Sequence, residues 1–395
     1  MSARGRLRIL FLAPQPFFEV RGTPLAVRAM LEALGELGHQ VDLLTYPQGE
    51  DQPLPGVRHR RSLPLPVGRV RPGPSLGKTL LDVPFMAQAA ALMATRRYDV
   101  VHAVEEAAHL AAPLARLFRV PLVMDVDSSI PDQMREGGFA TRGPLLWLAE
   151  RLERHALRHS AAVITVCASL SDSVRARAPR ARVHQIEDPP LVDGAEAVDP
   201  ERMRALRASL GLEPEDRVVL YTGNLEPYQG VDLLLDAAAL LPGVRFVIVG
   251  GDPRHVAEAA ARAARQGAAA RVVFCGPRPT ADLPGFLALA DIVASPRVTG
   301  LNTPFKIYTY MASGKPIVAT RIASHTQVLD DTTAFLVDPE APALAAGIRR
   351  SLEERGEARR RADAARDRAG RDYSRARFRE KVQTAYAHFS LEASP

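Results

Sequence analysis

The feature that most constrains the fold is the alternation of short apolar runs with helical patterns along the chain. Strands that alternate with helices in this way form parallel α/β layers. In the first half the expected strands are residues 8–13, 41–45, 99–102, 121–126, 162–166 and 183–186. In the second half they are residues 218–221, 245–249, 272–275, 292–295 and 316–319.

The length indicates two domains, because 395 residues exceed what one ordinary core accommodates. Residues 187–194 (Glu-Asp-Pro-Pro-Leu-Val-Asp-Gly) break the alternation and are the expected linker. We therefore predict an α/β protein with two doubly wound, Rossmann-like domains that face a cleft, where ligands bind at the carboxyl ends of the strands. The expected boundaries are 1–190 and 191–375, with a terminal helix at 376–395 that packs back on the first domain.

Composition excludes several classes of protein. The two cysteines, Cys167 and Cys275, are far apart and form no Cys-x-x-Cys pair, which argues against a disulfide scaffold and indicates a reducing compartment. No apolar run is long enough to span a membrane, so we expect a cytoplasmic protein. A P-loop and a first-strand Gly-x-Gly-x-x-Gly motif are both absent, which argues against ATPases and dehydrogenases. No metal-ligand motif occurs either, so no metal is expected.

The positive charge is concentrated in the first half of the chain. The net charge is +6; residues 1–190 hold 24 Lys/Arg against 19 Asp/Glu, and residues 191–395 hold 27 against 26. Residues 52–81 contain six basic residues, six prolines and no acidic residue, which predicts a basic loop. Such a loop suits an anionic acceptor or membrane surface, with Arg58, Arg60 and Arg61 as candidate contacts. The alternative is an ordinary solvated loop.

Two segments of the second half have the pattern of an anion-binding site. Residues 221–230 (Tyr-Thr-Gly-Asn-Leu-Glu-Pro-Tyr-Gln-Gly) leave an apolar run through a glycine turn and enter a helical pattern at Val231. A helix that begins there presents free N–H groups, which favour anions. Residues 302–319 lead from a second helix into another buried strand.

The first half carries two comparable segments. Residues 10–23 end in the pair Gly22-Thr23 before a helical pattern, and a glycine there lets backbone N–H groups approach phosphates. An ordinary loop glycine is the alternative. Residues 99–102 read Asp-Val-Val-His and are followed by two glutamates.

These four segments together resemble the retaining family 4 glycosyltransferases of the GT-B fold. The resemblance spans nearly the whole chain. It implies that the second domain binds a nucleotide diphosphate sugar and that the first binds the acceptor, a lipid-linked or cell-envelope saccharide. It also implies transfer with retention of configuration, without a metal or other cofactor. The basic loop adds the expectation of a peripheral site at the inner face of the cell membrane. No nucleic-acid partner is expected.

The chain departs from this family at its charged donor positions. The usual Gly-Arg-x4-Lys-Gly is here Gly223-Asn224 and Gln229-Gly230, and the usual Glu-x7-Glu pair falls on Leu301 and Thr309. We interpret the chain as a variant branch in which Lys306 is the leading phosphate cation, Arg297 the second, and Thr309 a contact to the ribose. The candidate donor-binding residues are Gly22, Thr23, Gly223, Asn224, Gln229, Arg297, Asn302, Thr303, Lys306 and Thr309.

His102 and Asp127 are the candidate catalytic residues. His102 could orient or deprotonate an acceptor hydroxyl. A histidine that ends a buried strand is, however, more often a hydrogen-bonded core residue. Asp125 and Asp127 lie two apart at the end of another expected strand, and Asp127, past the strand end, is the better candidate for a sugar hydroxyl.

Two other functions remain open at this stage. Because all four charged donor positions are neutral, the chain could be a catalytically silent relative that binds a nucleotide sugar or assists an active transferase. A nucleotide-sugar 2-epimerase shares the fold, but the missing glutamate pair argues against it. An epimerase would alter the donor without any acceptor, which separates it from a transferase.

Overall fold

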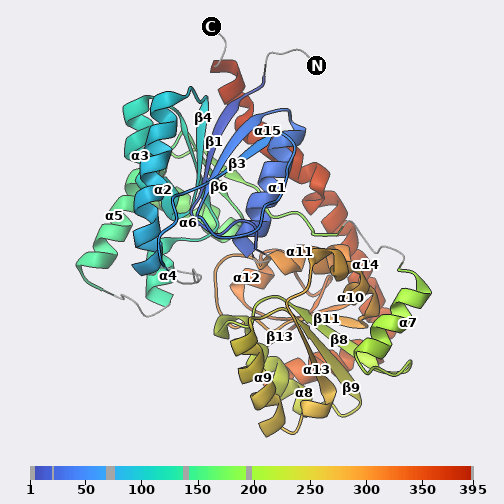
Figure 1. The fold of residues 1–395 in the computed structure, drawn as a ribbon. Coiled ribbons are helices and arrows are strands. Elements are labelled where there is room, and N and C mark those ends of the chain that lie inside the picture. Colours follow the sequence, from blue (N-terminus) through green and yellow to red (C-terminus); the bar gives the residue numbers. More distant parts are fainter. Residues whose placement is uncertain (1–4, 20–21, 68–75, 137–141, 193–197, 393–395) are drawn as a thin grey trace. The chain divides into compact units, whose positions relative to one another are not determined.

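The computed structural model describes residues 5–19, 22–67, 76–136, 142–192 and 198–392 (Figure 1). The chain divides into two compact units. Unit 1 comprises Met1–Asp188 and Phe378–Pro395, and unit 2 comprises Pro189–Arg377. Each unit is an α/β fold on a parallel sheet, so the predicted fold class is confirmed.

The described residues of unit 1 form a seven-stranded parallel sheet in the order β3-β2-β1-β4-β5-β6-β7. The order turns back beside β1, where neighbouring connections run to opposite sides, as in doubly wound folds. Phe11 of β1 is in register with Leu43 of β2 and His102 of β4. The strands are β1 (Arg8–Ala13), β2 (Gln40–Thr45), β3 (Val57–Arg61), β4 (Val100–Val104), β5 (Leu122–Val126), β6 (Ala162–Thr165) and β7 (Val183–Gln185).

Helices cover both faces of this sheet, because alternate strand residues point to opposite sides. Leu10 and Leu12 pack on one side, and Ile9 and Phe11 on the other. The first side is covered by α2 (Leu76–Thr95), α3 (Glu106–Phe118), α5 (Pro144–His159) and α6 (Ala168–Arg177). The second is covered by α1 (Gly22–Glu36) and α15 (Arg375–Glu392), while α4 (Ile130–Glu136) lies between β5 and α5 in the chain.

Helix α15 returns from the end of unit 2 to complete the core of unit 1 (Figure 1). Val382 and Tyr386 are fully buried among residues of β1, β4 and α1. Lys381 forms an ion pair with Glu187, and the Tyr386 hydroxyl lies 2.6 Å from Nδ1 of His102. The last helix of the chain thus holds a polar side chain at the centre of the first unit.

The described residues of unit 2 form a six-stranded parallel sheet in the order β10-β9-β8-β11-β12-β13. Helices α8, α9 and α13 pack on one face, and α10, α11 and the end of α14 on the other. The strands are β8 (Arg217–Thr222), β9 (Val244–Val249), β10 (Val272–Gly276), β11 (Ile292–Ser295), β12 (Ile317–Thr320) and β13 (Phe335–Val337). The helices are α7 (Pro200–Ser209), α8 (Val231–Ala239), α9 (Pro253–Arg265), α10 (Leu283–Leu289), α11 (Phe305–Ala312), α12 (Ala323–Thr326), α13 (Ala341–Glu353) and α14 (Arg355–Arg368).

Two strands were not expected from the sequence, and both are edge strands. The prediction that residues 52–81 form a loop was wrong at Val57–Arg61, which pairs with β2 as β3. Its sequence, Val-Arg-His-Arg-Arg, lacks an apolar alternation because the edge strand is not fully buried on either face. Strand β13 is only three residues long, which is too short to show a strand pattern in the sequence.

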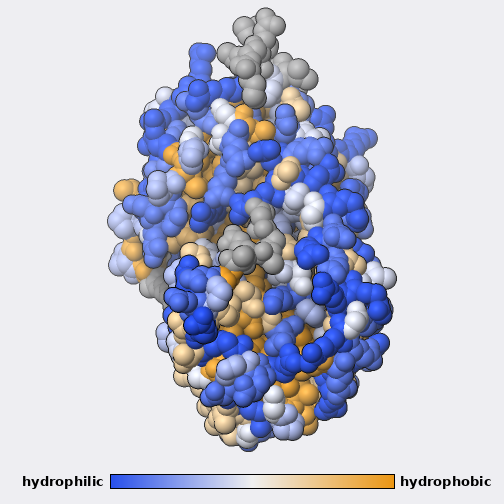
Figure 2. Space-filling view, turned by 90° about the vertical axis from the view of Figure 1, so that its right-hand side faces the viewer, coloured by the Kyte–Doolittle hydropathy of each residue, from blue (hydrophilic) through white to orange (hydrophobic). Residues whose placement is uncertain are grey.

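Hydrophilic residues cover most of the face shown in Figure 2. In the part formed by unit 2, hydrophobic residues show through between them. Partly buried hydrophobic side chains of this unit, such as Leu206, Leu210 and Leu283, pack against its core. Scattered apolar surface of this kind is ordinary in a folded domain.

We predict that Tyr386→Phe destabilises unit 1. The substitution removes the hydroxyl that meets His102 Nδ1 and leaves a buried ring nitrogen without that partner. An unsatisfied buried polar group costs about 1–3 kcal/mol, so the free energy of unfolding should fall by about that amount. Denaturant unfolding measures it. Tyr228→Phe, at a more exposed tyrosine, should change stability by less than about 0.5 kcal/mol; equal stability of Tyr386→Phe and the parent protein would contradict the prediction.

Candidate donor and acceptor sites

The loop after β8 is shaped by two glycines with positive φ. Gly223 has φ 136° and Gly230, directly before α8, has φ 68°. A Cβ atom at Gly230 would collide with the carbonyl of Pro296, so only glycine lets this loop approach the end of β11. The short 3₁₀ turn Pro227–Gln229 joins the two glycines. The candidate donor motif therefore forms a compact loop at the carboxyl ends of β8 and β11.

Lys306, in the first turn of α11, projects its amine into this loop. Its Nζ lies 3.9 Å from the centre of the Tyr221 ring and donates a hydrogen bond of 3.0 Å to Oε1 of Gln229. A Cβ at Gly223 would lie 2.9 Å from the same nitrogen. In the described part of the chain no carboxylate pairs with this amine. Burial, and to a lesser degree the charge of Arg297, hold the pKa of Lys306 well below its ordinary value.

Arg297 organises the neighbouring loop. Its guanidinium donates to the carbonyl oxygens of Thr299 and Asn302 and to Oδ1 of Asn302, at 2.7–3.0 Å. It also lies 5.3 Å from the centre of the Tyr228 ring. The side chain is almost fully buried. The second cation expected from the sequence is thus close to the first, and it fixes the loop that contains Asn302.

The hydroxyl residues of this region differ in their contacts. Thr309 is buried, and its Oγ1 accepts a hydrogen bond from the backbone N–H of Leu191 at 3.0 Å. Thr303 is also buried, and its Oγ1 has no hydrogen-bond partner among the described residues. The Asn224 side chain accepts from the backbone N–H of Glu226. Of the two threonines, Thr303 therefore has the oxygen that a ligand could engage.

His325 is a buried structural residue next to these side chains. Its Nε2 lies 2.9 Å from Oγ of Ser295, and its Nδ1 lies 2.8 Å from the carbonyl oxygen of Thr320. Burial is the main cause that lowers the pKa of His325 to about 4. The ring is therefore neutral at physiological pH and ties β11 to β12.

In unit 1, His102 lies at the centre of a polar chain. Its Nε2 is 3.1 Å from Oδ2 of Asp125, its Nδ1 is 2.6 Å from the Tyr386 hydroxyl, and its ring stacks on Phe11 at 4.1 Å. The side chain has no exposed surface. Both ring nitrogens are therefore engaged, which is the arrangement of a core histidine that orients its neighbours.

Asp127, just beyond the end of β5, is close to the start of α1. Its carboxylate accepts a hydrogen bond from the Thr23 hydroxyl, and Gly22 is the first residue of that helix. Burial, together with the charges of Asp125, Glu105 and Asp188, raises the pKa of Asp127 well above its ordinary value. The structure thus brings together Gly22, Thr23 and Asp127, which the sequence had assigned to separate roles.

Two further acidic residues complete this group. Glu105 precedes α3 with φ 49°, a strained conformation for a residue with a side chain, and its carboxylate accepts from Ser128 at 2.6 Å. Burial is the largest cause that raises the pKa of Glu105 to about 6 and that of Asp188 to about 8. The two glutamates that follow residues 99–102 are conspicuous in the sequence, whereas nothing in the Glu-Asp-Pro-Pro linker marks Asp188.

The three arginines of the expected basic surface lie on β3. Arg61 donates to Asp51 at 2.7 Å and to the carbonyl of Gln48 at 2.8 Å. Arg60 lies 3.5 Å from Asp42. Arg58 is largely exposed, 4.0 Å from the same carboxylate. Two of the three are therefore occupied by contacts within unit 1.

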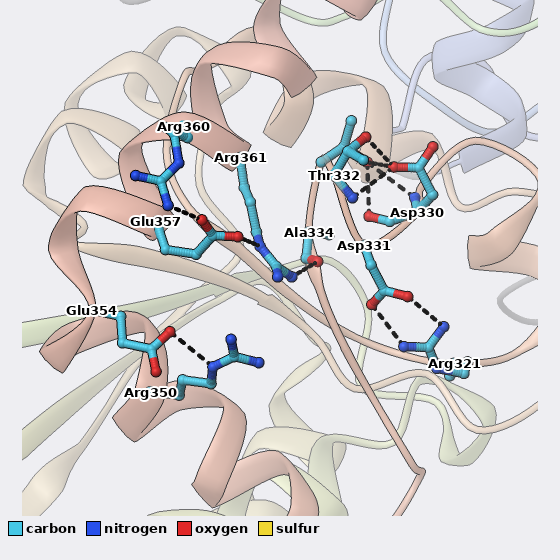
Figure 3. A network of polar contacts seen from close by, with 11 residues as sticks. Arg321, Asp330, Asp331, Thr332, Ala334, Arg350, Glu354, Glu357, Arg360 and Arg361 are labelled. Atoms are coloured by element: carbon cyan, nitrogen blue, oxygen red, sulfur yellow. Dashed lines mark hydrogen bonds and ion pairs between the residues drawn. The ribbon is translucent and has the colours of Figure 1, made fainter.

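A pocket of about 480 Å³ lies elsewhere in unit 2, between β13, α13 and α14. Its arginines are paired with carboxylates (Figure 3): Arg321 with Asp331, Arg361 with Glu357 and Arg350 with Glu354. Arg361 also donates to the carbonyl of Ala334, beside the edge strand. The arginines of this pocket are therefore paired with carboxylates, and Arg361 in addition holds the backbone before the edge strand β13.

Within the described ranges, no group of three or more His, Cys, Asp or Glu side chains could hold a metal ion. Among the same residues, no helix has the length and apolar character needed to cross a membrane.

Two family models match the chain, one in each unit. Residues 21–188 match "Glycosyl transferase 4-like domain", and residues 216–354 match "Glycosyl transferases group 1". Among curated proteins, the D-inositol 3-phosphate glycosyltransferase of Jonesia denitrificans is 32% identical over 164 residues, which is 38% of this chain and 38% of that protein. That of Mycobacterium bovis (strain BCG / Pasteur 1173P2) is 35% identical over 145 residues, 35% of this chain and 30% of that protein. The chain thus matches only about a third of the length of these relatives.

Solved structures share the fold over almost the whole chain. Sucrose-phosphate synthase from Thermosynechococcus elongatus has a TM-score of 0.81 at 21% identity, over 98% of this chain and 100% of that one. Anabaena HepE in complex with UDP-glucose has a TM-score of 0.76 at 20% identity, over 97% and 100%. Each unit of this fold thus matches a glycosyltransferase domain model, which supports a glycosyltransferase of the family 4-like type with the GT-B fold.

Proposed function

We propose that this protein transfers a glycosyl group from a nucleoside diphosphate sugar, bound by unit 2, to an acceptor hydroxyl bound by unit 1. The observation that carries the proposal is the amine of Lys306, which is held on the Tyr221 ring beside Gln229 and is not paired with a carboxylate among the described residues.

A cation in this position is unfavourable without an anion. Burial in a protein disfavours the charged form of lysine, and the lowered pKa of Lys306 expresses that penalty. A diphosphate would supply the missing counter-charge. The same amine would then stabilise the negative charge that grows on the diphosphate as the glycosidic bond breaks, and one such interaction typically contributes about 3 kcal/mol to catalysis.

Lys306 would take over the role of the missing lysine at position 229. Its amine donates to Oε1 of Gln229, so it reaches the place to which a side chain at that position points. Arg297 would assist by fixing the loop of Asn302. The Thr303 hydroxyl, which has no hydrogen-bond partner among the described residues, would bind a donor hydroxyl or donate to a phosphate oxygen. In the same proposal Gly223 and Asn224 shape the phosphate loop, whereas Thr309 stabilises the backbone at Leu191.

In unit 1 the proposal assigns the acceptor contact to Asp127. A carboxylate with a raised pKa is a better proton acceptor near neutral pH, and Asp127 has one. Thr23 orients this carboxylate, and His102 holds the adjacent Asp125 in place. The acceptor class that we propose, a lipid-linked or cell-envelope saccharide, and retention of configuration rest on the family resemblance.

The alternative of a silent nucleotide-sugar-binding relative is favoured by one observation. The four positions that are usually charged hold Asn224, Gln229, Leu301 and Thr309. Turnover of the donor separates the two functions, because both require the same binding site.

We predict that UDP stabilises the protein against heat and that Lys306→Ala weakens the effect. UDP is the first probe because HepE binds UDP-glucose; GDP and ADP serve as comparisons. At a hundredfold excess over its dissociation constant a ligand stabilises by about 2.7 kcal/mol, which thermal unfolding detects.

Lys315→Gln is the matched control for this measurement. Lys315 also has a lowered pKa, but its amine donates to the carbonyls of Ala288 and Ala290. This variant should keep the response to UDP. If none of the three nucleotides stabilised the parent protein, donor binding by unit 2 would be wrong.

We predict that nucleotide binding takes up a proton. The pKa of Lys306 is lowered in the free protein, and a bound diphosphate would raise it again. Protons are therefore taken up at any pH between these two pKa values, and affinity falls as the pH rises through that range. Calorimetry in buffers of different ionisation enthalpy measures the uptake. The Lys306→Met variant should bind the nucleotide more weakly and without proton uptake. An unchanged proton uptake in this variant would assign the proton to another group.

We predict that Asp127→Asn lowers turnover and raises stability. Loss of a general base typically costs about 10²–10⁴ in rate. The pKa of Asp127 is higher in the folded protein than in the unfolded chain. The protonated side chain therefore adds to the free energy of unfolding at acidic pH, and this stabilisation is lost as the pH rises from the unfolded pKa to the folded pKa. The gain in melting temperature should therefore be larger at neutral than at acidic pH. Asp132→Asn, which breaks the ion pair with Arg177, should instead lower stability. A fully active Asp127→Asn variant would contradict the assignment.

A further inference from the structure

Three adjacent helices of unit 1 expose large hydrophobic side chains. Helix α3 packs against both α2 and α5 on the same side of the sheet (Figure 1). Of the thirteen large hydrophobic residues that are exposed in the described part of the chain, eight lie on these helices. We call this surface the α2–α3–α5 face.

The apolar side chains on this face follow the helical periodicity. On α5, Leu145, Leu148 and Leu152 are spaced i, i+3 and i+7, so they form one stripe that points away from the core. On α2, Leu80 and Val83 are 56% and 69% exposed. On α3, Leu117 is 73% exposed. Large hydrophobic side chains that are exposed together in one patch are typical of interaction surfaces, whereas single exposed ones are ordinary.

A second stripe on α5 is aromatic and basic. Trp147, Arg151, Arg154 and Arg158 are spaced i, i+4, i+7 and i+11 and are all exposed. The Arg151 guanidinium lies 5.5 Å from the centre of the Trp147 ring. A tryptophan next to arginines, beside a stripe of leucines, has the amphipathic pattern of helices that lie in a lipid–water interface.

The charge of this face has one sign. The acidic residues of the three helices are each bound inside unit 1: Asp82 to Tyr46, Glu106 to Lys78, Glu150 to Arg135 and Glu153 to Arg177. Exposed arginines flank the apolar stripes, among them Arg116 and Arg119 at the end of α3. A partner that covers this face must therefore be apolar and anionic. A second copy of the same face would bring like charges together, which opposes self-association.

We propose that the α2–α3–α5 face docks on an anionic lipid bilayer, with the leucines and Trp147 in the interface and the arginines at the phosphates. This surface is distinct from Arg58, Arg60 and Arg61 on β3, two of which are occupied by intramolecular contacts. The proposal does not depend on the transferase activity.

Trp147 provides a direct test, because it is the only tryptophan in the chain. It is 58% exposed, so its fluorescence in buffer should be that of a solvated indole. Vesicles of phosphatidylglycerol and phosphatidylcholine should shift its emission to the blue and carry the full-length protein with them on flotation. Vesicles of phosphatidylcholine alone should do neither, and high salt should weaken the binding.

Substitution of the three arginines on α5 tests whether vesicle binding depends on this face or only on the net positive charge of the protein. Each arginine near an anionic surface strengthens binding about fivefold, so Arg151→Gln/Arg154→Gln/Arg158→Gln should bind on the order of a hundredfold more weakly. Arg202→Gln/Arg204→Gln/Arg265→Gln removes the same charge from exposed positions of unit 2 and should bind like the parent protein. Leu145→Ser/Leu148→Ser keeps Trp147 as the probe and should reduce the blue shift. Circular dichroism verifies that each variant is folded.

The proposal is wrong if anionic vesicles leave the Trp147 emission unchanged, or if both triple variants bind equally. A blue shift that grows with protein concentration in the absence of lipid would show instead that a second copy covers the face.

Discussion

The constraint on which both sites depend is the parallel pairing of the strands. Because all strands of a sheet run the same way, their carboxyl ends and the following loops meet at one edge. In unit 2 this edge collects the loop after β8 and the start of α11, so that Lys306 reaches Gln229, which is 77 positions earlier in the chain. In unit 1 it collects residues that follow β4 and β5 with the start of α1, which places Glu105, Asp127 and Thr23 together.

The two edges carry unfavourable charge of opposite sign. In unit 1, carboxyl groups crowd one another and their pKa values rise, as at Asp127 and Asp188. In unit 2, an amine is buried beside an arginine and its pKa falls. Neither arrangement stabilises the folded protein, because each raises the free energy of the charged form of the side chain. Within each unit, groups whose pKa values are perturbed in this way are characteristic of sites whose charges are compensated by a ligand or by a proton in transit.

The sequence revealed the fold well, and the reason is visible in particular elements. The predicted strands Arg8–Ala13 and Ile292–Ser295 have the bounds of the structure, since strong apolar runs define them. Strand β3 was missed because an edge strand need not be apolar. At the site, the motif indicated Lys306, but only the structure shows that Thr309 bonds to Leu191. The left-handed backbone of Glu105 and the burial of Asp188 depend on tertiary contacts and leave no local pattern.

The neutral residues at the positions that are usually charged are easier to explain as one concerted replacement than as independent losses. A lysine at position 229 would lie within hydrogen-bond distance of the Lys306 amine, and two ammonium groups at that separation repel strongly. Glutamine avoids this repulsion and accepts a hydrogen bond from Lys306, so it fixes the amine that we propose as the replacement for the missing cation. The glycine at 223 leaves the space that this amine needs, because a Cβ there would lie 2.9 Å from it. Burial of a lysine that pairs with no carboxylate in the described part of the chain is costly, so the amine of Lys306 is easier to explain where an anion binds than where a donor site has merely been lost.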